Sequence, residues 1–449
     1  MTHTAPPYIA YSSNSIQHAA QFQKLPAIER HAVEIVSKVL PFKANSYVIE
    51  ELIDWDNFKS DPMFTLIFPQ KEMLSDDHFS RMEQLVKHNA SAQAIAHEVQ
   101  KIRMELNPHP SAQLRNIPQI HGQPLPGVQH KYRETVLFFP SQGQTCHAYC
   151  TFCFRWPQFV GMSDIKFATR EIQTFVEYLK AHKEVTDVLF TGGDPMIMKT
   201  SILENYIDAL LKDDLSHIRT IRIGTKALSY WPYRFTHDPD ADDLRRLFER
   251  VVKSGRNLFI MAHFNHYREL QPKAQRDATR AILDTGAQIR TQSPVLKHIN
   301  DDPNVWATMW REQVDQNMIP YYMFVERDTG PKQFFEIPLE HAWNIFREAY
   351  QRVSGICRTV RGPVMSATPG KVQVLGVADV AGERVFTLRF LQGRNPDWVA
   401  RPFFAKHDQG ATWLDQLTPA FGDEKFFYQN ELNSILGGDS DFDDSISFE

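Results

Sequence analysis

Residues 135–153 read TVLFFPSQGQTCHAYCTFC. The apolar, β-branched run at 135–140 is typical of a buried strand, and three cysteines follow it in the spacing C-x3-C-x2-C. Three thiolates on one tight loop can hold three irons of a cubane cluster and leave the fourth iron without a protein ligand. The segment therefore predicts a 4Fe–4S cluster on Cys146, Cys150 and Cys153, with one iron open to a substrate or cosubstrate.

Two other interpretations of these cysteines are open. A structural zinc site usually takes four protein ligands, often in two pairs, but the other cysteine, Cys357, is remote in sequence and His147 lies inside the loop. Inert buried cysteines are the plainer interpretation. The spacing and the strand before it together favour the iron–sulfur cluster over both.

Downstream of the cysteines, short β-branched or aromatic runs alternate with longer amphipathic ones. Strands are expected at 135–140, 186–191, 220–224, 258–263, 288–292 and 319–325. Helices are expected at 168–182, 201–212, 242–254, 275–285, 304–316 and 339–352. Six strand–helix units in succession predict an α/β fold with a parallel sheet, either open or curled into a barrel. In both arrangements ligands bind at the C-terminal ends of the strands.

The 449-residue chain is long enough for additions around this core. Residues 1–125 are mostly polar, with helix-like apolar spacing at 78–97 and 92–106. We interpret them as a mostly helical N-terminal accessory region. The predicted core then spans residues 126–355.

The C-terminal part has its own pattern. Residues 356–436 are predicted to form a small extension, with strand-like runs at 371–377 and 384–391. The segment 437–449 is acidic and rich in small residues, a composition typical of disorder.

Composition and charge argue against several classes of partner. The net charge is −5, so there is no global basic field for nucleic acid or an acidic membrane. No apolar run approaches the roughly 20 residues of a membrane span, and the N-terminus lacks the pattern of a secretory signal. Clustered rather than dispersed cysteines suit a reducing compartment. We therefore expect a cytoplasmic protein that binds neither nucleic acid nor membrane.

A second motif follows the second expected strand, in the segment FTGGDP at 190–195. Gly192 and Gly193 let the backbone come close to a ligand, and Asp194 can accept a hydrogen bond from an ammonium group. Such a motif alone is more often a turn. Its position one strand–helix unit after the cysteines makes a ligand contact the better interpretation.

The cysteine spacing, with aromatic Phe152 before the third cysteine, resembles the signature of the radical S-adenosylmethionine superfamily. The resemblance implies that the open iron binds the methionyl amine and carboxylate of S-adenosylmethionine. It also implies that Phe152 lies near the adenine and that the Gly192-Gly193-Asp194 motif meets the methionyl amine.

Residues 131–374 further resemble the lysine 2,3-aminomutase family. The matching pieces occur in order, most of them at strand ends: His130-Lys-Tyr, Cys153-Phe-Arg155, Gly-Gly-Asp194, Ile221-Arg-Ile-Gly224, His263-Phe-Asn-His266, Gln292 followed by Ser-Pro-Val-Leu, Ile299-Asn-Asp, Pro320-Tyr-Tyr and Pro-Gly-Lys371. The resemblance implies a partial (β/α)6 barrel with a helical N-terminal region and a small C-terminal extension. It also implies pyridoxal phosphate as a second cofactor.

The same resemblance implies roles for individual residues. Lys371 becomes the lysine that binds pyridoxal phosphate covalently and acts in catalysis, while Lys131 and Tyr132 lie near its phosphate. Gln292 becomes a further cofactor-binding residue. Arg155 becomes the residue that binds the substrate α-carboxylate, for which a guanidinium fork is suited.

Departures from the family pattern bear on the substrate. Where lysine-specific members place acids against the distal ammonium group, this chain has Arg327 and Ser366. Replacing acids by a cation and a hydroxyl inverts the charge preference, so we expect an acidic or neutral polar amino acid. A register shift of one residue would place Asp328 there instead of Arg327. The C-terminal cysteine cluster that binds zinc in some members is absent, so no zinc is expected.

Three functions follow in order of preference. The first is an isomerase that moves the α-amino group of an amino acid to the β-carbon, and the second is a radical S-adenosylmethionine enzyme of another type, including one that acts on a protein lysine. The third is a non-enzymatic iron–sulfur sensor, which would need neither Asp194, Arg155 nor Lys371. An enzyme of this kind needs a reductant such as flavodoxin or ferredoxin, and a homo-oligomer is compatible with the sequence.

Overall fold

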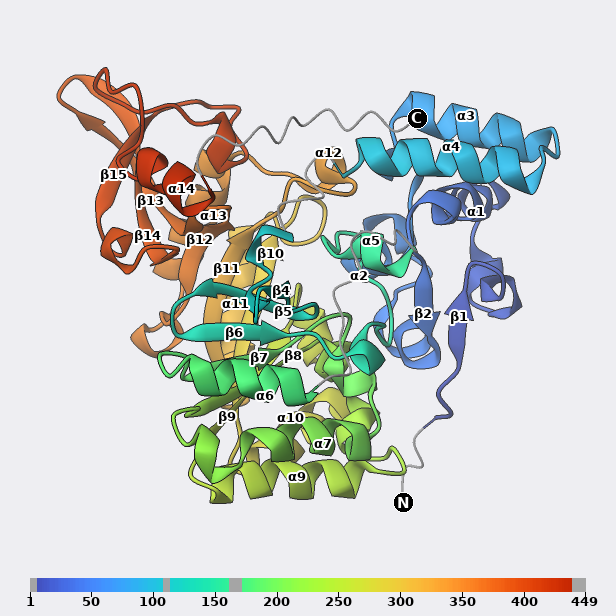
Figure 1. Ribbon diagram of the computed structural model, residues 1–449. Coiled ribbons are helices and arrows are strands. Elements are labelled where there is room, and N and C mark those ends of the chain that lie inside the picture. Colours follow the sequence, from blue (N-terminus) through green and yellow to red (C-terminus); the bar gives the residue numbers. More distant parts are fainter. Residues whose placement is uncertain (1–5, 108–113, 161–171, 438–449) are drawn as a thin grey trace.

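The computed structural model describes residues 6–107, 114–160 and 172–437. Its centre is an eleven-stranded sheet in which every strand lies beside its predecessor in the chain, from β5 to β15 (Figure 1). The strands are β5 Val128–Tyr132, β6 Thr135–Phe138, β7 Asp187–Phe190, β8 Thr220–Thr225, β9 Asn257–His263, β10 Gln288–Val295, β11 Ile319–Val325, β12 Arg361–Ser366, β13 Gly370–Val380, β14 Glu383–Gly393 and β15 Pro402–Lys406.

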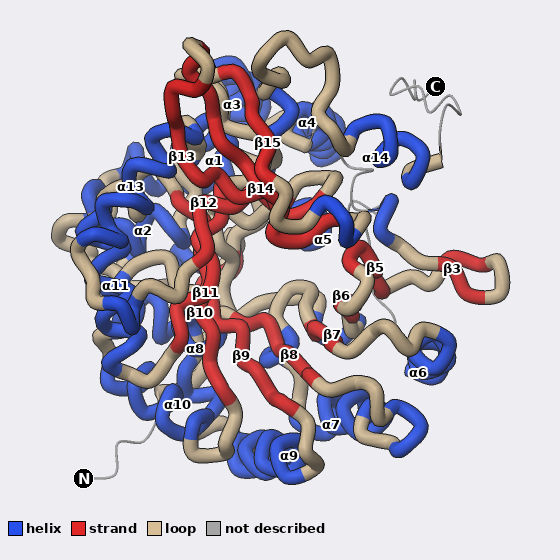
Figure 2. Tube along the Cα trace, turned by 90° about the vertical axis from the view of Figure 1, so that its left-hand side faces the viewer, coloured by secondary structure: helices blue, strands red, loops and turns tan. Residues whose placement is uncertain are grey.

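Strands β6 to β12 are parallel and are joined by helical crossovers. The crossover helices are α6 Ile172–Ala181, α7 Thr200–Leu210, α9 Ala241–Lys253, α10 Lys273–Leu283, α11 Pro303–Asp315 and α13 Leu339–Gln351. They cover one face of the sheet, which Figure 2 shows as a curved band of strands with helices along its outer side. The prediction of a mixed α/β fold is confirmed.

The periodicity of the residues explains this layering. In α9, Leu244, Leu247, Phe248 and Val251 recur at helical spacing and are all buried. In β8, Ile221, Ile223 and Thr225 are buried towards the helices, while Arg222 on the alternate face is partly exposed. The strands therefore bury one face under the helices and carry polar side chains on the inner face of the curve.

The expected elements lie within a few residues of those observed, and the expected strand at 319–325 coincides with β11. The expected helix at 168–182 begins in residues that the structure does not describe. One expectation was wrong: residues 78–97 do not form one helix. Helix α3 Asp76–Lys87 ends before a turn with Asn89 at φ 50, and α4 Ala92–Glu105 begins after the N-cap Ser91.

The sheet does not stop at the expected core boundary near residue 355. Strand β12, which sequence reasoning missed, pairs in parallel with β11. Strands β13, β14 and β15 then continue the same sheet in antiparallel fashion. Helix α14 Gln429–Ile435 packs beside them through Leu432. Residues 438–449, most of the tail predicted to be disordered, lie outside the described residues.

The N-terminal region packs against the cysteine loop. It contains α1 Ala27–Val39, α2 Pro62–Ile67, α3, α4 and the paired strands β1 Ala10–Ser12 and β2 Lys43–Asn45. Its apolar core also includes Phe152 and Trp156 from the cysteine segment. The loop that carries the cysteines is therefore buried between the N-terminal region and the sheet.

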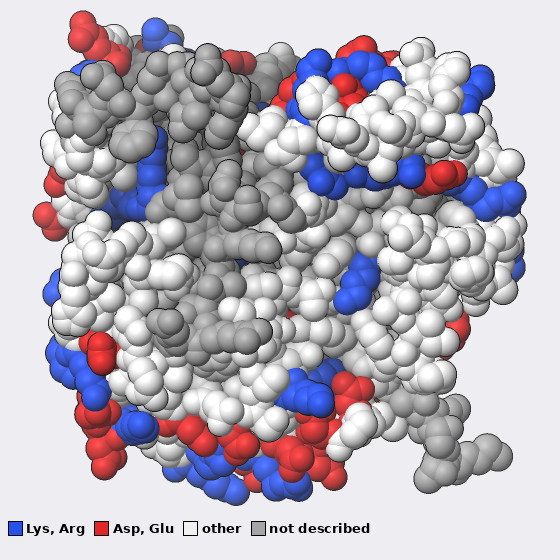
Figure 3. All heavy atoms as spheres, turned by 45° about the vertical axis from the view of Figure 1, so that its right-hand side comes forward, with Lys and Arg blue, Asp and Glu red and all other residues white. Residues whose placement is uncertain are grey.

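The surface carries mixed charge. Figure 3 shows acidic and basic side chains interspersed along the lower edge of the molecule. Helices α7 and α9 lie at this edge (Figure 1) and are joined there by ion pairs from Arg250 to Glu204 and Asp208. In the described part of the chain, no helix is long and apolar enough to cross a membrane.

Candidate active site

The three clustered cysteines lie on the loop between β6 and the short helix α5 Trp156–Phe159. Burial raises the pKa of all three thiols: Cys150 to about 11, Cys153 to about 12 and Cys146 well above its usual value. These partly buried thiols thus need nearby positive charge before they ionise. Irons in a cluster would supply that charge.

Within the described residues, no three His, Cys, Asp or Glu side chains converge closely enough to hold one metal ion. A single ion such as zinc keeps every thiolate about 2.3 Å away. In a cubane the three thiolates bind three different irons, so they need not converge on one point. The arrangement of the thiols is compatible with the cluster, whose assignment depends on the sequence motif.

Residues from the N-terminal region hold the cysteine loop. The Lys43 ammonium donates to the carbonyl oxygen of Cys146 at 2.7 Å. The Asn45 amide donates to the carbonyl oxygens of His147 at 3.1 Å and Tyr230 at 2.9 Å. The sequence indicated no chemistry for this region, and nothing in its local pattern shows that Lys43 and Asn45 meet a loop a hundred residues away.

The Gly192-Gly193-Asp194 motif packs directly on the cysteine loop. A Cβ atom at Gly193 would lie 2.4 Å from the carbonyl oxygen of Thr145, so only glycine fits. The backbone N–H of Asp194 donates to that same oxygen at 2.8 Å. The motif thereby brings the C-terminal end of β7 against the start of the cysteine segment.

The Asp194 carboxylate already has several partners. It accepts hydrogen bonds from the Thr225 hydroxyl and from the backbone N–H groups of Lys226 and Met196. Burial outweighs these bonds and raises the pKa of Asp194 to about 6. The carboxylate therefore joins the ends of β7 and β8. Its predicted contact with a methionyl amine stays a prediction and would compete with these donors.

Phe152, His263 and Gln292 meet at the C-terminal ends of the strands. The ring of Phe152 is 5.7 Å from that of His263, and Gln292 on β10 pairs with His263 on β9. Burial lowers the pKa of His263 well below its usual value, and its buried Nε2 atom has no hydrogen-bond partner in the part of the chain that the structure describes. A neutral imidazole and an aromatic face fit the predicted neighbourhood of an adenine.

Arg155 and Arg327 both lie against Phe154. The guanidinium carbons are 5.2 Å and 5.1 Å from the centre of that ring, and Arg155 is also 4.5 Å from the ring of Phe139. Burial, together with the charge of the nearby Arg327, lowers the pKa of Arg155 to about 10. Among the described residues, Nη1 of Arg155 is buried and has no hydrogen-bond partner. Two neighbouring guanidiniums with a free donor form a site for an anion.

Lys131, Tyr132, Ser366 and Lys371 also come together. Lys131 donates to the carbonyl oxygen of Ala367, and Lys371 lies 4.8 Å from the centre of the Tyr132 ring. The Tyr132 hydroxyl faces Ser366 and is buried without a hydrogen bond of good geometry. Ser366 pairs with Lys371 across β12 and β13, so four residues named from sequence lie together in one cluster.

Lys371 is the second residue of β13, directly after the tight turn that follows β12. Its Nζ donates to Oε1 of Gln392 at 2.5 Å. Burial, together with the charges of Arg222 and Arg361, lowers the pKa of Lys371 to about 7. An amine that is neutral near pH 7 can act as a nucleophile, which suits covalent attachment to an aldehyde.

Three arginines beside this pocket were missed by sequence reasoning. Arg222 forms an ion pair with Asp187. Arg361 lies 4.2 Å from the centre of the Tyr321 ring, and Arg394 lowers the pKa of buried Lys131. The alternation within Ile221-Arg-Ile could have marked Arg222 as inward-facing. Arg361 and Arg394 belong to elements that the sequence did not predict as part of this site.

The pocket fits an anionic cofactor. Burial lowers the pKa of Lys131 and Arg394 as well as that of Lys371. Such depressed values show cations that lack sufficient counter-charge. A phosphate and a carboxylate would supply it, so the residues present fit pyridoxal phosphate and an amino-acid substrate.

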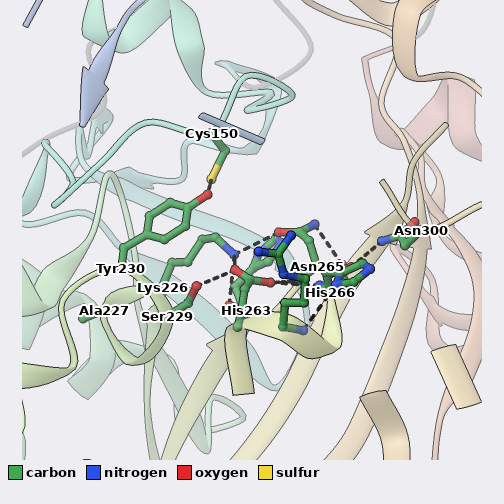
Figure 4. Close-up of polar contacts among 12 residues, drawn as sticks. Cys150, Lys226, Ala227, Ser229, Tyr230, His263, Asn265, His266 and Asn300 are labelled. Atoms are coloured by element: carbon green, nitrogen blue, oxygen red, sulfur yellow. Dashed lines mark hydrogen bonds and ion pairs between the residues drawn. The ribbon is translucent and has the colours of Figure 1, made fainter. Parts of the chain in front are cut away.

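A second network missed from the sequence lies beside the cysteines (Figure 4). Nζ of Lys226 is 2.5 Å from Glu269 Oε1 and 2.9 Å from Asn265 Oδ1, and Glu269 is fully buried. Lys226 also lies 4.5 Å from the centre of the Tyr230 ring. The hydroxyl of Tyr230 is 3.4 Å from Sγ of Cys150.

Comparison with known proteins shows several relatives. A protein of Aquifex aeolicus (strain VF5) named "Putative L-lysine 2,3-aminomutase" is 31% identical over 413 residues, which is 92% of this chain and 96% of that protein. L-lysine 2,3-aminomutase of Acetoanaerobium sticklandii is 27% identical over 57% of this chain and 58% of that enzyme. Glutamate 2,3-aminomutase of Clostridioides difficile is 28% identical over 47% of each chain.

Other comparisons add little. No protein-family model matches the chain. Among solved structures, Streptococcus suis SuiB aligns with a TM-score of 0.35 and 13% identity, over 63% of this chain and 59% of that one. A similarity of this size carries no argument about the fold.

Proposed function

The chain belongs to the lysine 2,3-aminomutase family of radical S-adenosylmethionine enzymes, and from that membership we propose that it moves the α-amino group of an acidic or neutral polar amino acid to the β-carbon with the help of pyridoxal phosphate. The family makes the chain an isomerase of the 2,3-aminomutase type. It also implies a 4Fe–4S cluster and S-adenosylmethionine. The choice of substrate and the use of pyridoxal phosphate are our proposals.

The bound groups supply a 5′-deoxyadenosyl radical and an electron sink, and the protein supplies position and charge. Cys146, Cys150 and Cys153 would ligate the cluster. Lys371, with its low pKa, would bind the pyridoxal phosphate aldehyde, and Arg155 would orient the substrate α-carboxylate. These residues are neighbours in space. Arg155 interacts electrostatically with both Cys153 and Arg327, and Arg327 interacts in the same way with Tyr132.

One observation carries the proposed substrate class: Arg155 and Arg327 lie against the same ring of Phe154. An α-amino acid with a distal carboxylate offers one anion to each guanidinium, whereas the ammonium of lysine would meet a like charge. Asp328 follows Arg327 in the chain, and its negative charge favours the charged form of the Arg327 guanidinium. Sequence identity does not decide between substrates, because relatives named for lysine and for glutamate match at 27% and 28%.

A further proposal concerns the fold. Parallel strands β6 to β12 in chain order, with the curvature seen in Figure 2, support a partial barrel of the radical S-adenosylmethionine type.

Reduction of the cluster needs one electron from outside the protein, so we propose a small electron carrier such as flavodoxin or ferredoxin as a partner.

The test is an anaerobic assay of the reconstituted enzyme with S-adenosylmethionine, pyridoxal phosphate and dithionite against a panel of α-amino acids. We expect mass spectrometry to find a β-amino acid from glutamate, aspartate or a neutral polar amino acid. Formation of β-lysine alone would overturn the substrate class. Release of 5′-deoxyadenosine without any β-amino acid would overturn the proposal that one of these free amino acids is the substrate.

A matched variant tests the cofactor. Lys371→Ala should abolish β-amino acid formation and the borohydride-fixed attachment of pyridoxal phosphate, while iron content stays unchanged. Lys183→Ala offers a control, because Lys183 is exposed and its Nζ donates to the carbonyl oxygen of Asp214, outside the site. Full turnover by Lys371→Ala would rule out the proposed use of pyridoxal phosphate.

A further inference from the structure

The hydroxyl of Tyr230 lies 3.4 Å from the sulfur of Cys150 (Figure 4). Tyr230 is the last residue of the short helix α8 Ala227–Tyr230, which follows β8, and its side chain is buried. An iron-bound thiolate carries no proton and can only accept a hydrogen bond. In the loaded protein the tyrosine would therefore be the donor and the sulfur the acceptor.

The surroundings fix this tyrosine in place. The Asn45 amide donates to the backbone carbonyls of both Tyr230 and His147, so one side chain ties helix α8 to the cysteine loop. Asn45 is itself fully buried and accepts from the backbone N–H of Val48. The distance between hydroxyl and sulfur is thus set by the fold and does not depend on a mobile side chain.

A cation lies on the face of the same ring. Nζ of Lys226 is 4.5 Å from the centre of the Tyr230 ring. Glu269 and Asn265 hold it there at 2.5 Å and 2.9 Å. A cation over the ring draws electron density from the phenol and strengthens it as a donor. None of these residues was needed to explain the binding of cofactors or substrate.

We propose that Tyr230 tunes the reduction potential of the cluster by donating a hydrogen bond to the sulfur of Cys150. Hydrogen bonds to the cysteine sulfurs are one of the factors that set the potentials of iron–sulfur clusters. When the external electron carrier gives one electron to the cluster, the negative charge on the sulfurs grows and the bond strengthens. The hydroxyl keeps its proton, so the step transfers one electron and no proton.

This inference rests on the proposed function in one respect, namely that Cys150 ligates iron. Tyr230→Phe removes the donor and keeps the ring. Tyr149→Phe is the matched control, because its hydroxyl lies on the same loop but contacts the Thr145 hydroxyl at 3.1 Å. The measurement is a redox titration of the reconstituted full-length proteins, followed by electron paramagnetic resonance and normalised to bound iron.

We expect Tyr230→Phe to lower the ratio of reduced to oxidised cluster about tenfold at a fixed solution potential, which corresponds to about 59 mV for one electron. Tyr149→Phe should match the unmodified enzyme. Electron–nuclear double resonance in deuterated buffer should also show an exchangeable proton coupled to the reduced cluster that Tyr230→Phe lacks. Equal midpoint potentials and an unchanged proton signal would overturn the role of Tyr230.

Loss of the cluster and loss of the Tyr230 effect give different results. Unmodified enzyme that binds no iron would overturn the cluster and with it the proposed function. A normal cluster whose potential does not respond to Tyr230→Phe would overturn only this inference. A Tyr230→Phe protein that binds less iron is still read at its residual clusters, because the titration is normalised to iron.

Discussion

The two ends of the active site need opposite charges from their ligands. The cysteine end carries Cys146, Cys150 and Cys153, and the lysine end carries Lys131 and Lys371. At the cysteine end, burial raises the pKa of the thiols, Cys150 to about 11 and Cys153 to about 12. At the lysine end, burial lowers the pKa of Lys371 to about 7 and that of Lys131 well below its usual range. The first group is short of positive charge and the second of negative charge. Each end is thus complementary to a different partner, irons in one case and phosphate or carboxylate in the other.

Different parts of the fold hold the two ends of the active site. The cysteine end is held from outside the sheet, by Lys43 and Asn45 of the N-terminal region. The lysine end belongs to the sheet itself, through β12 and β13. Arg155 lies near Cys153 and Arg327, and Arg327 lies near Tyr132, so the two arginines connect the two ends.

The largest effect is expected from removal of a thiol. Cys153→Ala should lose bound iron and all formation of 5′-deoxyadenosine, because two thiolates cannot replace the three that the cubane needs. Iron analysis and product assay measure both. Cys357→Ala is the control, since Cys357 is buried elsewhere, next to Ser354. Normal iron in Cys153→Ala would show that the cysteine end is not the cluster site.

A change of charge between the two ends should alter specificity. Arg327→Asp should shift the preference from acidic towards basic amino acids, by about one to two orders of magnitude in relative kcat/KM, because a partly buried cation becomes an anion. Competition between glutamate and lysine in one assay measures the ratio. An unchanged ratio would count against Arg327 as a substrate contact.

The lysine end should show its charge as a pH dependence. Because the pKa of Lys371 is lowered to about 7, the neutral amine predominates above that pH. The rate of borohydride-fixed attachment of pyridoxal phosphate should therefore rise as the pH increases through about 7. The usual lysine value lies near 10.4. Arg361→Met removes a cation that depresses this pKa, so the midpoint should move to higher pH.

The control for this shift is Arg250→Met, because Arg250 is exposed on α9 and pairs with Glu204 and Asp208. It should leave the midpoint unchanged. A midpoint near the ordinary lysine value in the unmodified enzyme would contradict the electrostatic description of the pocket. A midpoint that moves to lower pH in Arg361→Met would contradict the sign of the effect.

The smallest expected effect concerns the support of the cysteine end. Asn45→Ala leaves the carbonyls of His147 and Tyr230 without their shared donor, which costs about 1–3 kcal/mol of unfolding free energy. Urea denaturation of the protein without cofactors measures the loss. Asn57→Ala is the control, since Asn57 is exposed and its side chain bonds to Asp54. Equal stability of the two variants would show that the N-terminal region does not brace this loop.

Much of the site was predictable where chemistry is encoded locally. The spacing of Cys146, Cys150 and Cys153 and the position of Gly193 after a strand could be seen in the sequence, since both lie on single loops. The roles of Lys371 and Arg155 came only from family resemblance, because a lone lysine or arginine carries no local signal. Their roles stay predictions, although the structure brings Lys371, Lys131, Tyr132 and Ser366 into one pocket.

Some predictions were less complete. Sequence reasoning missed β12 and so separated Lys371 from the core sheet to which it is joined. It gave Asp194 a contact with an ammonium group, which stays a prediction, and did not indicate that Thr225 and Lys226 bind the carboxylate. It merged α3 with the start of α4, because the apolar spacing continues through a turn. In each case the deciding partner lies far away in the chain or follows from backbone geometry.

The alternation of strands and helices from β6 to α13 followed from the sequence alone, since apolar residues at a period of two or of 3.6 fix which face of each element is buried. The cluster of positive charge around Lys371 and Lys131 did not follow from the sequence. Arg222 and Arg361 lower the pKa of Lys371, and Arg394 lowers that of Lys131, only because the fold brings these distant segments together away from water. Electrostatic energy depends on distance and on exclusion of water, and both exist only once the chain has folded.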